Sequence, residues 1–372
     1  MKFDINQNEF PSATHKSIWH SAVFMAPFYE VIPPRLNGRE ANDLREGEKN
    51  LYRFMTDLYS DMYDNPEKYY LPVMEYDLLL NGRDWRSLNG NDKKKESNLR
   101  NRFQRKIQFY QKLLFEIGIN GETEAGTDSL SSDKPILTNV IANHTLRIIW
   151  DQREQCAEAL SRLGLEIKRF NNKITVSNSQ YPKMLFALSA LCKAGKGKFA
   201  LTNFLRCDFR GLLNSYIPGF EDTVSILPDG FKKKAIIMNE FMKDLKCKTI
   251  VEPLKNTTLY SEWKLFYSFK GKSIYGFHSD TESLKTFAYF NHYENVSRMG
   301  YILKEESDSL YNWFYDCIPI SMCSCRNNKL VNVGGREKRI CGLTNRIDVI
   351  NPDDANLKNL KRIIEIYLDK VM

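Results

Sequence analysis

The sequence predicts an α+β protein: a helical N-terminal part followed by antiparallel hairpins and a meander covered by helices. Three observations support this prediction. Before residue 120, apolar residues recur every three or four positions, as on one face of a helix. After residue 135, such stretches alternate with short runs of alternating apolar residues joined by turns, which is typical of antiparallel strands. Between the two parts lies the polar segment NGETEAGTDSLSSDKP, residues 120–135.

We expect residues 1–119 to be mainly helical. A first helix should carry an apolar face made by Leu51, Met55, Leu58 and Met62. Asn65-Pro66 should end it, because a residue before proline disfavours helical geometry. A second helix should carry the stripe Leu99, Phe103, Ile107, Tyr110, Leu114 and Ile117, with Gly118 as its expected C-cap.

Residues 120–135 are rich in Gly, Ser, Thr and Asp and contain almost no large apolar residues. Such a segment buries too little apolar surface to offset the entropy of ordering it, so it predicts a linker or an exposed loop. The expected organisation is therefore a helical region at 1–119, a linker at 120–135 and an α+β region at 136–372. The last region has a candidate division near residue 255.

Within 136–372, local signals predict a helix, a hairpin and two more helices. The first helix should end at Gly164, and LEIKRFNNKITVS, residues 165–177, should turn back at Asn171-Asn172. Pro182 should open the next helix. Asp229 should cap the third. The residues expected to face inward on these helices are Ile149, Cys156, Leu160, Leu163, Leu185, Leu188, Cys192, Ala235, Met238, Met242 and Leu245.

Residues 261–291 predict a three-stranded antiparallel meander with a turn at Gly271. Its strands place aromatic side chains on both faces. Either both faces are covered, or one of them lines a pocket for a flat ligand. A helix with Leu310, Trp313, Phe314 and Cys317 on one face should follow. A last helix should have Asn351 as N-cap and Pro352 at its first position.

Four of the eight cysteines fall within residues 317–341, at Cys317, Cys323, Cys325 and Cys341. Structural zinc sites usually bring ligands in pairs on tight C-x2–4-C turns, whereas the spacing here is C-x5-C-x-C-x15-C. Cys317 extends the apolar stripe of its helix, and a reduced cysteine is readily buried. We therefore expect no metal, and four reduced thiols with Cys317 inside the core.

The turn expected at Gly334-Gly335 strengthens this interpretation. It pairs residues whose numbers sum to 669, so Cys341 should lie opposite Asn328. Cys325 would then be roughly 10 Å further along the strand. Thiolates that share one zinc ion lie within about 4 Å of each other.

The net charge of +8 favours an anionic partner, and the basic excess gathers around these cysteines. The candidate binding residues for nucleic acid are Arg326, Lys329, Arg336, Lys338 and Arg339, in a hairpin over 326–339. A solvated hairpin with no binding role explains the same charges.

The start of the sequence lacks the apolar core of a signal peptide, and no apolar run approaches the length of a membrane span. These features predict a cytoplasmic protein with reduced thiols and no membrane partner. Nucleotide-binding, zinc-protease and serine-hydrolase motifs are absent, so no cofactor is expected. KAGKGKF, residues 193–199, could hold a phosphate through its backbone amides or could simply end a helix.

By elimination, we expect a non-catalytic binding protein for another protein or a small molecule. Nucleic-acid binding through the basic hairpin is one alternative. The other is an enzyme whose site assembles from distant residues such as Asp208, Arg210 and His278. A structural ion pair explains Asp208 and Arg210 equally well.

Overall fold

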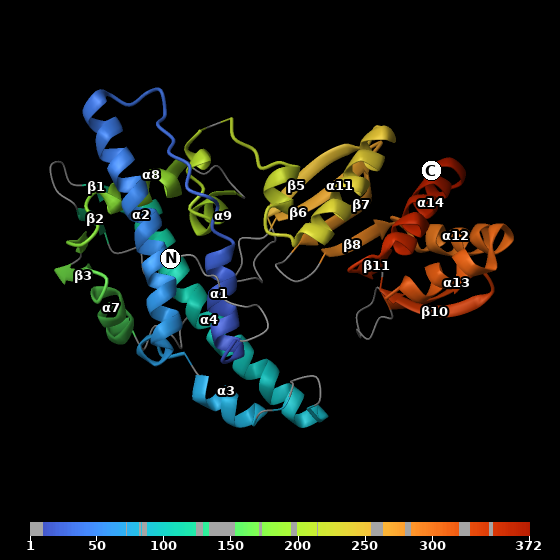
Figure 1. Cartoon of the computed structure of the whole chain (residues 1–372), viewed down its shortest axis with the longest axis horizontal. Helices are drawn as coiled ribbons and strands as arrows, with labels where there is room; N and C mark the ends of the chain where they lie inside the picture. Colours follow the sequence, from blue (N-terminus) through green and yellow to red (C-terminus); the bar gives the residue numbers. More distant parts are fainter. Residues whose placement is uncertain are drawn as a thin grey trace. The chain divides into compact units, whose positions relative to one another are not determined.

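The computed structural model describes residues 10–71, 73–81, 83, 88–123, 129–133, 153–170, 173–194, 199–213, 215–253, 263–279, 284–319, 328–341 and 345–372. Two compact units are present (Figure 1). The first comprises Met1–Ile217 and Lys255–Ser261, and the second comprises Pro218–Leu254 and Glu262–Met372. Both contain helices and antiparallel sheets, which confirms the α+β class. None of the described helices is both long and apolar enough to cross a bilayer.

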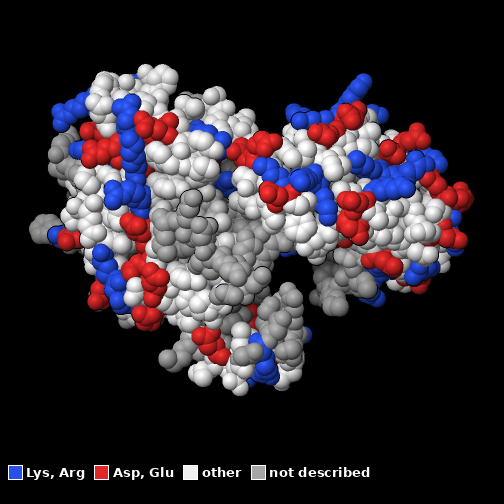
Figure 2. All heavy atoms as spheres, viewed as in Figure 1, with Lys and Arg blue, Asp and Glu red and all other residues white. Residues whose placement is uncertain are grey.

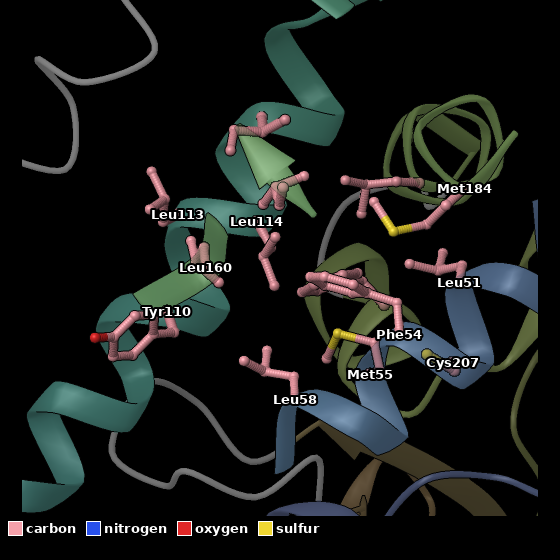
Figure 3. Close-up of a cluster of buried hydrophobic side chains, with 14 of the residues drawn as sticks. Leu51, Phe54, Met55, Leu58, Tyr110, Leu113, Leu114, Leu160, Met184 and Cys207 are labelled. Atoms are coloured by element: carbon pink, nitrogen blue, oxygen red, sulfur yellow. The ribbon is translucent and has the colours of Figure 1, made fainter. Parts of the chain in front are cut away.

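The first unit is mainly helical. Its helices are α1 (Ala13–Val23), α2 (Gly38–Asp64), α3 (Val73–Leu80), α4 (Gly90–Asn120), α7 (Arg153–Ser161), α8 (Met184–Ala194) and α9 (Ala200–Leu205), with the 3-10 helices η1 (Pro66–Tyr69) and η5 (Phe209–Leu212). Buried residues of α2, α4 and α8 share one core (Figure 3), with Phe54, Leu114 and Met184 all at most 1% exposed.

The predicted helix over 51–62 is confirmed as part of α2. Asn37 caps its start by accepting a hydrogen bond from the Glu40 amide at 3.0 Å, and the helix ends at Asp64, directly before Asn65-Pro66. The second predicted helix is α4, but it does not end at Gly118. The helix continues to Asn120. Gly118 lies inside it, where the missing side chain allows α4 to approach α8 closely.

A small sheet completes the first unit, with the order β1-β2-β4-β3. Its strands are β1 (Glu122–Thr123), β2 (Ser129–Asp133), β3 (Leu165–Phe170) and β4 (Lys173–Asn178). The predicted hairpin is confirmed, with Phe170 opposite Lys173, while the expected turn residues 171–172 and Ile149 lie outside the described residues.

The structure differs from the expectation for residues 120–135. Two parts of this segment pair as β1 and β2, and Leu130 is 1% exposed in the core of the first unit. In the described parts of this segment, strand pairing satisfies the backbone and Leu130 is buried, although the composition is typical of a linker. The two compact units divide after Ile217 rather than at 120–135.

The second unit contains a five-stranded antiparallel sheet in the order β11-β8-β7-β6-β5. The predicted meander is confirmed as β6 (Trp263–Phe269), β7 (Lys272–Ser279) and β8 (Leu284–Tyr289). Lys270 and Gly271 form the first turn with φ values of 47° and 78°, and the second value favours glycine. The flanking strands β5 (Lys248–Pro253) and β11 (Arg346–Ile350) were not predicted.

Among its described residues this unit has the helices α10 (Phe220–Val224), α11 (Asp229–Asp244), α12 (Tyr293–Glu306), α13 (Asp308–Cys317) and α14 (Asp354–Lys370). One face of the sheet is buried beneath them. Tyr267 donates a hydrogen bond to Asn239 of α11 at 2.7 Å, and Phe290 packs against Tyr367 of α14. Side chains on the other face are mostly half-buried, so the two faces differ.

Three predicted helix starts are shifted, and one of them is that of α8, which begins at Met184 rather than at Pro182. Asp229 is the first residue of α11 rather than its cap, and Leu245 lies just after the helix and is half-buried. The last helix is capped by Asp353, whose side chain accepts from the Asn356 amide at 2.7 Å. Asn351 instead has φ of 51° and accepts from the Leu284 amide at 2.9 Å, so it links the end of β11 to the sheet.

A separate hairpin, β9 (Asn328–Val333) and β10 (Arg336–Cys341), has the predicted register. Cys341 pairs with Asn328, and the turn residues Gly334 and Gly335 have φ values of 59° and 93°. Two successive positive φ angles are the geometry that a two-residue hairpin turn requires.

Candidate functional site

A cavity of about 450 Å³ opens on the first unit. This volume lies within the range of small-molecule sites, roughly 300–1,000 Å³. Side chains from α8, from β1 and from the segment before α2 line it: Arg35, Thr123, Phe186, Ser189, Ala190, Lys193 and Ala194.

The periodicity of α8 explains how these residues come together. Leu188, Leu191 and Cys192 are completely buried and face the core. Phe186, Ala190 and Lys193 follow one another at i, i+4 and i+7, so they lie along another face of the same helix. The cavity is therefore built on a helix that the core holds rigidly.

Hydrogen bonds tie β1 to this helix. The Lys193 ammonium donates to the Gly121 carbonyl at 2.7 Å and lies 3.2 Å from Glu122 Oε1. The Ser189 hydroxyl donates to the same carbonyl at 3.4 Å. Lys193 thus anchors β1, and Glu122 compensates part of the charge that it brings to the cavity.

The lining combines cationic and hydroxyl groups with apolar surface. Arg35 and Lys193 supply two cations, and Thr123 and Ser189 supply hydroxyl groups. Phe186 and the two alanines supply apolar surface. A guanidinium and an ammonium are the usual donors to carboxylate and phosphate groups.

Sequence reasoning found only one edge of this cavity. Lys193 and Ala194 begin the Gly/Lys segment 193–199, whose residues 195–198 lie outside the described residues. Arg35 and Phe186 belong to no motif and lie far apart in the sequence. No linear pattern could have joined them.

The candidate pair Asp208 and Arg210 forms a closed ion pair. Asp208 is 0% exposed and caps η5. Its Oδ1 accepts from Arg210 Nε at 2.8 Å, and its Oδ2 accepts from Arg210 Nη2 at 2.7 Å. The Tyr216 hydroxyl and the Arg210 amide also donate to it, at 2.9 and 3.3 Å.

The Arg210 guanidinium is itself held between two rings. It lies 4.2 Å from the ring centre of Tyr29 and 4.6 Å from that of Tyr216. With four donors on its two oxygens, the Asp208 carboxylate has no free lone pair for proton transfer. Its role is to fix the chain between α9 and the segment that follows. His278, the third residue of this hypothesis, belongs to the second unit.

The basic hairpin does not present its cations on one surface. Lys338 is 8% exposed, and its ammonium donates to the Tyr315 carbonyl. Arg336 stacks on the Tyr315 ring, 3.8 Å from its centre, and Lys329 lies over the Tyr293 ring at 5.2 Å.

Lys329, Arg336 and Lys338 lie on one face of the hairpin. Leu330 and Arg339 are exposed and pair with each other on the opposite face. Arg326 lies outside the described residues. On the visible face of each unit, Lys and Arg side chains are interspersed with Asp and Glu (Figure 2).

The cysteine cluster is described only in part. Cys317 is half-buried rather than inside the core, because it is the last residue of α13. Burial and the neighbouring Asp316 raise its pKa to about 11. Cys341 is buried, and Cys323 and Cys325 lie outside the described residues. Among the described residues, no three His, Cys, Asp or Glu side chains are arranged to hold a metal ion.

Comparisons with known proteins add no assignment: no protein-family model, curated protein or solved structure matches the chain.

Proposed function

We propose that this protein is a non-catalytic binding protein whose first unit holds a small anionic molecule in the cavity beside α8. The observation that carries the proposal is that Arg35 and Lys193 line the same concave site as Phe186. A carboxylate or phosphate would lie between the cations, and an apolar body would contact Phe186 and Ala190.

Concavity is what favours a small molecule over a protein partner at this site. A cavity of about 450 Å³ has room for a ligand of metabolite size, whereas protein partners bind mainly to flatter surfaces. The hydroxyl group of Thr123 at the wall would help to orient the anion.

We propose a cytoplasmic location for this activity. The supporting observation is that six described cysteines are free, and five of them are buried. Free thiols in this number are typical of a reducing compartment.

The test uses thermal shift with three probes: inorganic phosphate, benzoate and phenyl phosphate. Phenyl phosphate combines an anion with an apolar ring, so it should raise Tm the most, with the logarithmic concentration dependence of a ligand that binds only the native state. Benzoate should have a smaller effect, and inorganic phosphate the smallest.

Variants then locate the binding. Arg35 is exposed, so Arg35→Gln should preserve stability and abolish most of the shift. Ala190→Leu should fill the cavity and block the ring. Lys168→Gln, at an exposed lysine of β3, serves as the control and should respond like the wild type. An unchanged shift in both cavity variants, or no shift with any probe at millimolar concentration, would refute the proposal.

A further inference from the structure

The half-buried face of the five-stranded sheet gathers rings and cations. These side chains come from β6, β7, β8 and β11, which lie side by side in the second unit (Figure 1): Lys264, Phe266, His278, Phe287, Tyr289 and Arg346. The register brings them together. Phe266 pairs with Gly276, Gly276 pairs with Phe287, and Tyr289 pairs with Arg346.

The rings form a continuous group. The centre of Phe266 lies 5.9 Å from that of Tyr289, and Phe287 lies 6.3 Å from Tyr289. His278 stacks on Phe287 at 5.3 Å with an angle of 16° between the ring planes. Gly276 has no side chain, which lets the Phe266 ring lie against the sheet between the neighbouring strands.

Two cations lie over these rings. The Lys264 ammonium is 4.5 Å from the centre of Phe266 and 5.6 Å from that of Phe287, and the Arg346 guanidinium is 4.2 Å from Phe287. Arg346 is paired with Asp348 through bonds of 2.6 and 3.1 Å. Its charge is therefore largely compensated within the fold.

Lys264 has no hydrogen-bonded carboxylate among the described residues, although Glu252 lies opposite it on β5. Within the part of the chain that the structure describes, its ammonium has contacts with rings and no hydrogen-bond acceptor or ion-pair partner. Lys338 shows the contrast. It also lies over a ring, that of Tyr315, but it donates to a backbone carbonyl. A half-buried ammonium with three unused donors is a place where an anion would bind favourably.

The electrostatics agree with this geometry. Burial lowers the pKa of Lys264 and the nearby positive charge of Arg346 lowers it further, while the carboxylates of Glu252 and Asp348 oppose this shift. A bound phosphate would relieve the repulsion between Lys264 and Arg346.

We propose that this sheet face binds single-stranded nucleic acid, with a phosphate at Lys264 and a base against the Phe266 and Tyr289 rings. An open antiparallel sheet with rings and cations is an arrangement by which proteins stack unpaired bases while they hold the backbone. A duplex hides its bases from such rings. An acidic peptide would match the charge but leave the rings without a partner.

The test measures fluorescence anisotropy with a labelled oligothymidylate of about 12 nucleotides, and with a duplex of equal length as competitor. The single strand should bind more tightly than the duplex. Lys264→Gln should raise Kd about three- to tenfold at low salt and reduce the slope of log K against log salt by about 0.7. Phe266→Leu should raise Kd roughly fivefold or more, because a base loses its stacking partner.

A matched control is Lys361→Gln. Lys361 of α14 is also half-buried and lies over a phenyl ring, that of Phe241 at 5.3 Å, but it is not on the sheet face. The Lys361→Gln variant should bind the single strand like the wild type. Circular dichroism should confirm that each variant is folded. Equal binding of single strand and duplex, or an equal loss in Lys361→Gln and Lys264→Gln, would overturn the proposal.

The Arg35→Gln variant separates this site from the cavity of the first unit. It should leave strand binding unchanged, so each site can fail without the other. Heparin, a polyanion without bases, should compete weakly and should do so equally against wild type and Phe266→Leu. Stronger competition by heparin than by the single strand would show a charge-only surface and overturn the stacking role.

Discussion

Gly118 of α4 lies directly against Cys192 of α8. A methyl group at Gly118 would stand 2.6 Å from the Cys192 sulfur and 3.0 Å from Leu188 Cγ, closer than such atoms can approach. Both partners are completely buried, so neither has space to move aside. The absence of a side chain at one position thus sets how closely two core helices pack.

Gly118→Ala should therefore lower the free energy of unfolding by about 1–3 kcal/mol, although alanine favours a helix more than glycine does. Urea denaturation measures this. Gly90→Ala is the control in the same helix, because nothing lies within 4 Å of a methyl group there. If the two variants prove equally stable, the close contact does not limit packing.

Glu48 should make stability fall as pH rises. It is 0% exposed, its Oε2 accepts from the Val31 amide at 3.1 Å, and its Oε1 has no partner among the described residues. Burial, followed by the charge of Glu30, raises its pKa from 4.5 to about 8, against the opposing effects of Val31, Arg45 and Lys49. The native state keeps a proton that the unfolded chain has lost.

Between pH 4.5 and about 8, each unit of pH should therefore remove up to about 1.4 kcal/mol from the free energy of unfolding. Glu48→Gln imitates the protonated acid and should flatten this slope, with a gain of about 1–3 kcal/mol at alkaline pH. Glu46→Gln, an exposed position on the same helix, should keep the wild-type slope. A Glu48→Gln profile parallel to the wild type would contradict the assignment.

Replacing neighbouring cations of the β9–β10 hairpin should have different effects on the stability of the protein. Lys338→Gln removes the donor to a buried carbonyl and should cost about 1–3 kcal/mol. Arg339→Gln, at an exposed position, should change stability by less than about 0.5 kcal/mol. Thermal unfolding compares the two. Equal stability losses in the two variants would refute the assigned packing of Lys338. If this hairpin binds nucleic acid, Arg339→Gln should in addition weaken that binding and reduce its salt dependence.

The cysteines between 317 and 341 should remain unmetallated. The paired register sets Cys341 opposite Asn328, and Cys317 ends a helix whose apolar residues explain its position. Elemental analysis of protein purified without chelator should find less than stoichiometric zinc. One zinc per chain, lost on replacing Cys317 or Cys341 by Ser, would show a shared metal site.

The second unit should fold by itself. Its sheet and helices come from Pro218–Leu254 and Glu262–Met372, so the continuous fragment 218–372 contains all of them. This fragment should unfold cooperatively on heating, because the Leu265, Tyr267 and Phe277 core is internal to it. A fragment without a cooperative transition would show that the unit depends on the rest of the chain.

Local signals predicted much of the fold and little of the candidate sites. The meander and both hairpins followed from alternation and from turn residues, glycine at Gly271 and Gly334-Gly335 and asparagine at Asn171-Asn172, and α2 ended where proline required it. The strands β5 and β11 escaped prediction because each is short and flanks strands with far stronger aromatic patterns. Arg35 and Phe186 escaped because neither residue belongs to a motif.

The sequence by itself determined the α+β class, the register of the Gly334-Gly335 hairpin and the end of α2, since these depend on side-chain periodicity and on the φ preferences of single residues. Only the tertiary structure decided that Leu130 enters the core, that Lys338 is buried while Arg339 is exposed, and that Lys264 lies over rings from two strands. Composition describes a residue's chemistry, but its burial and partners depend on which distant segments pack against it.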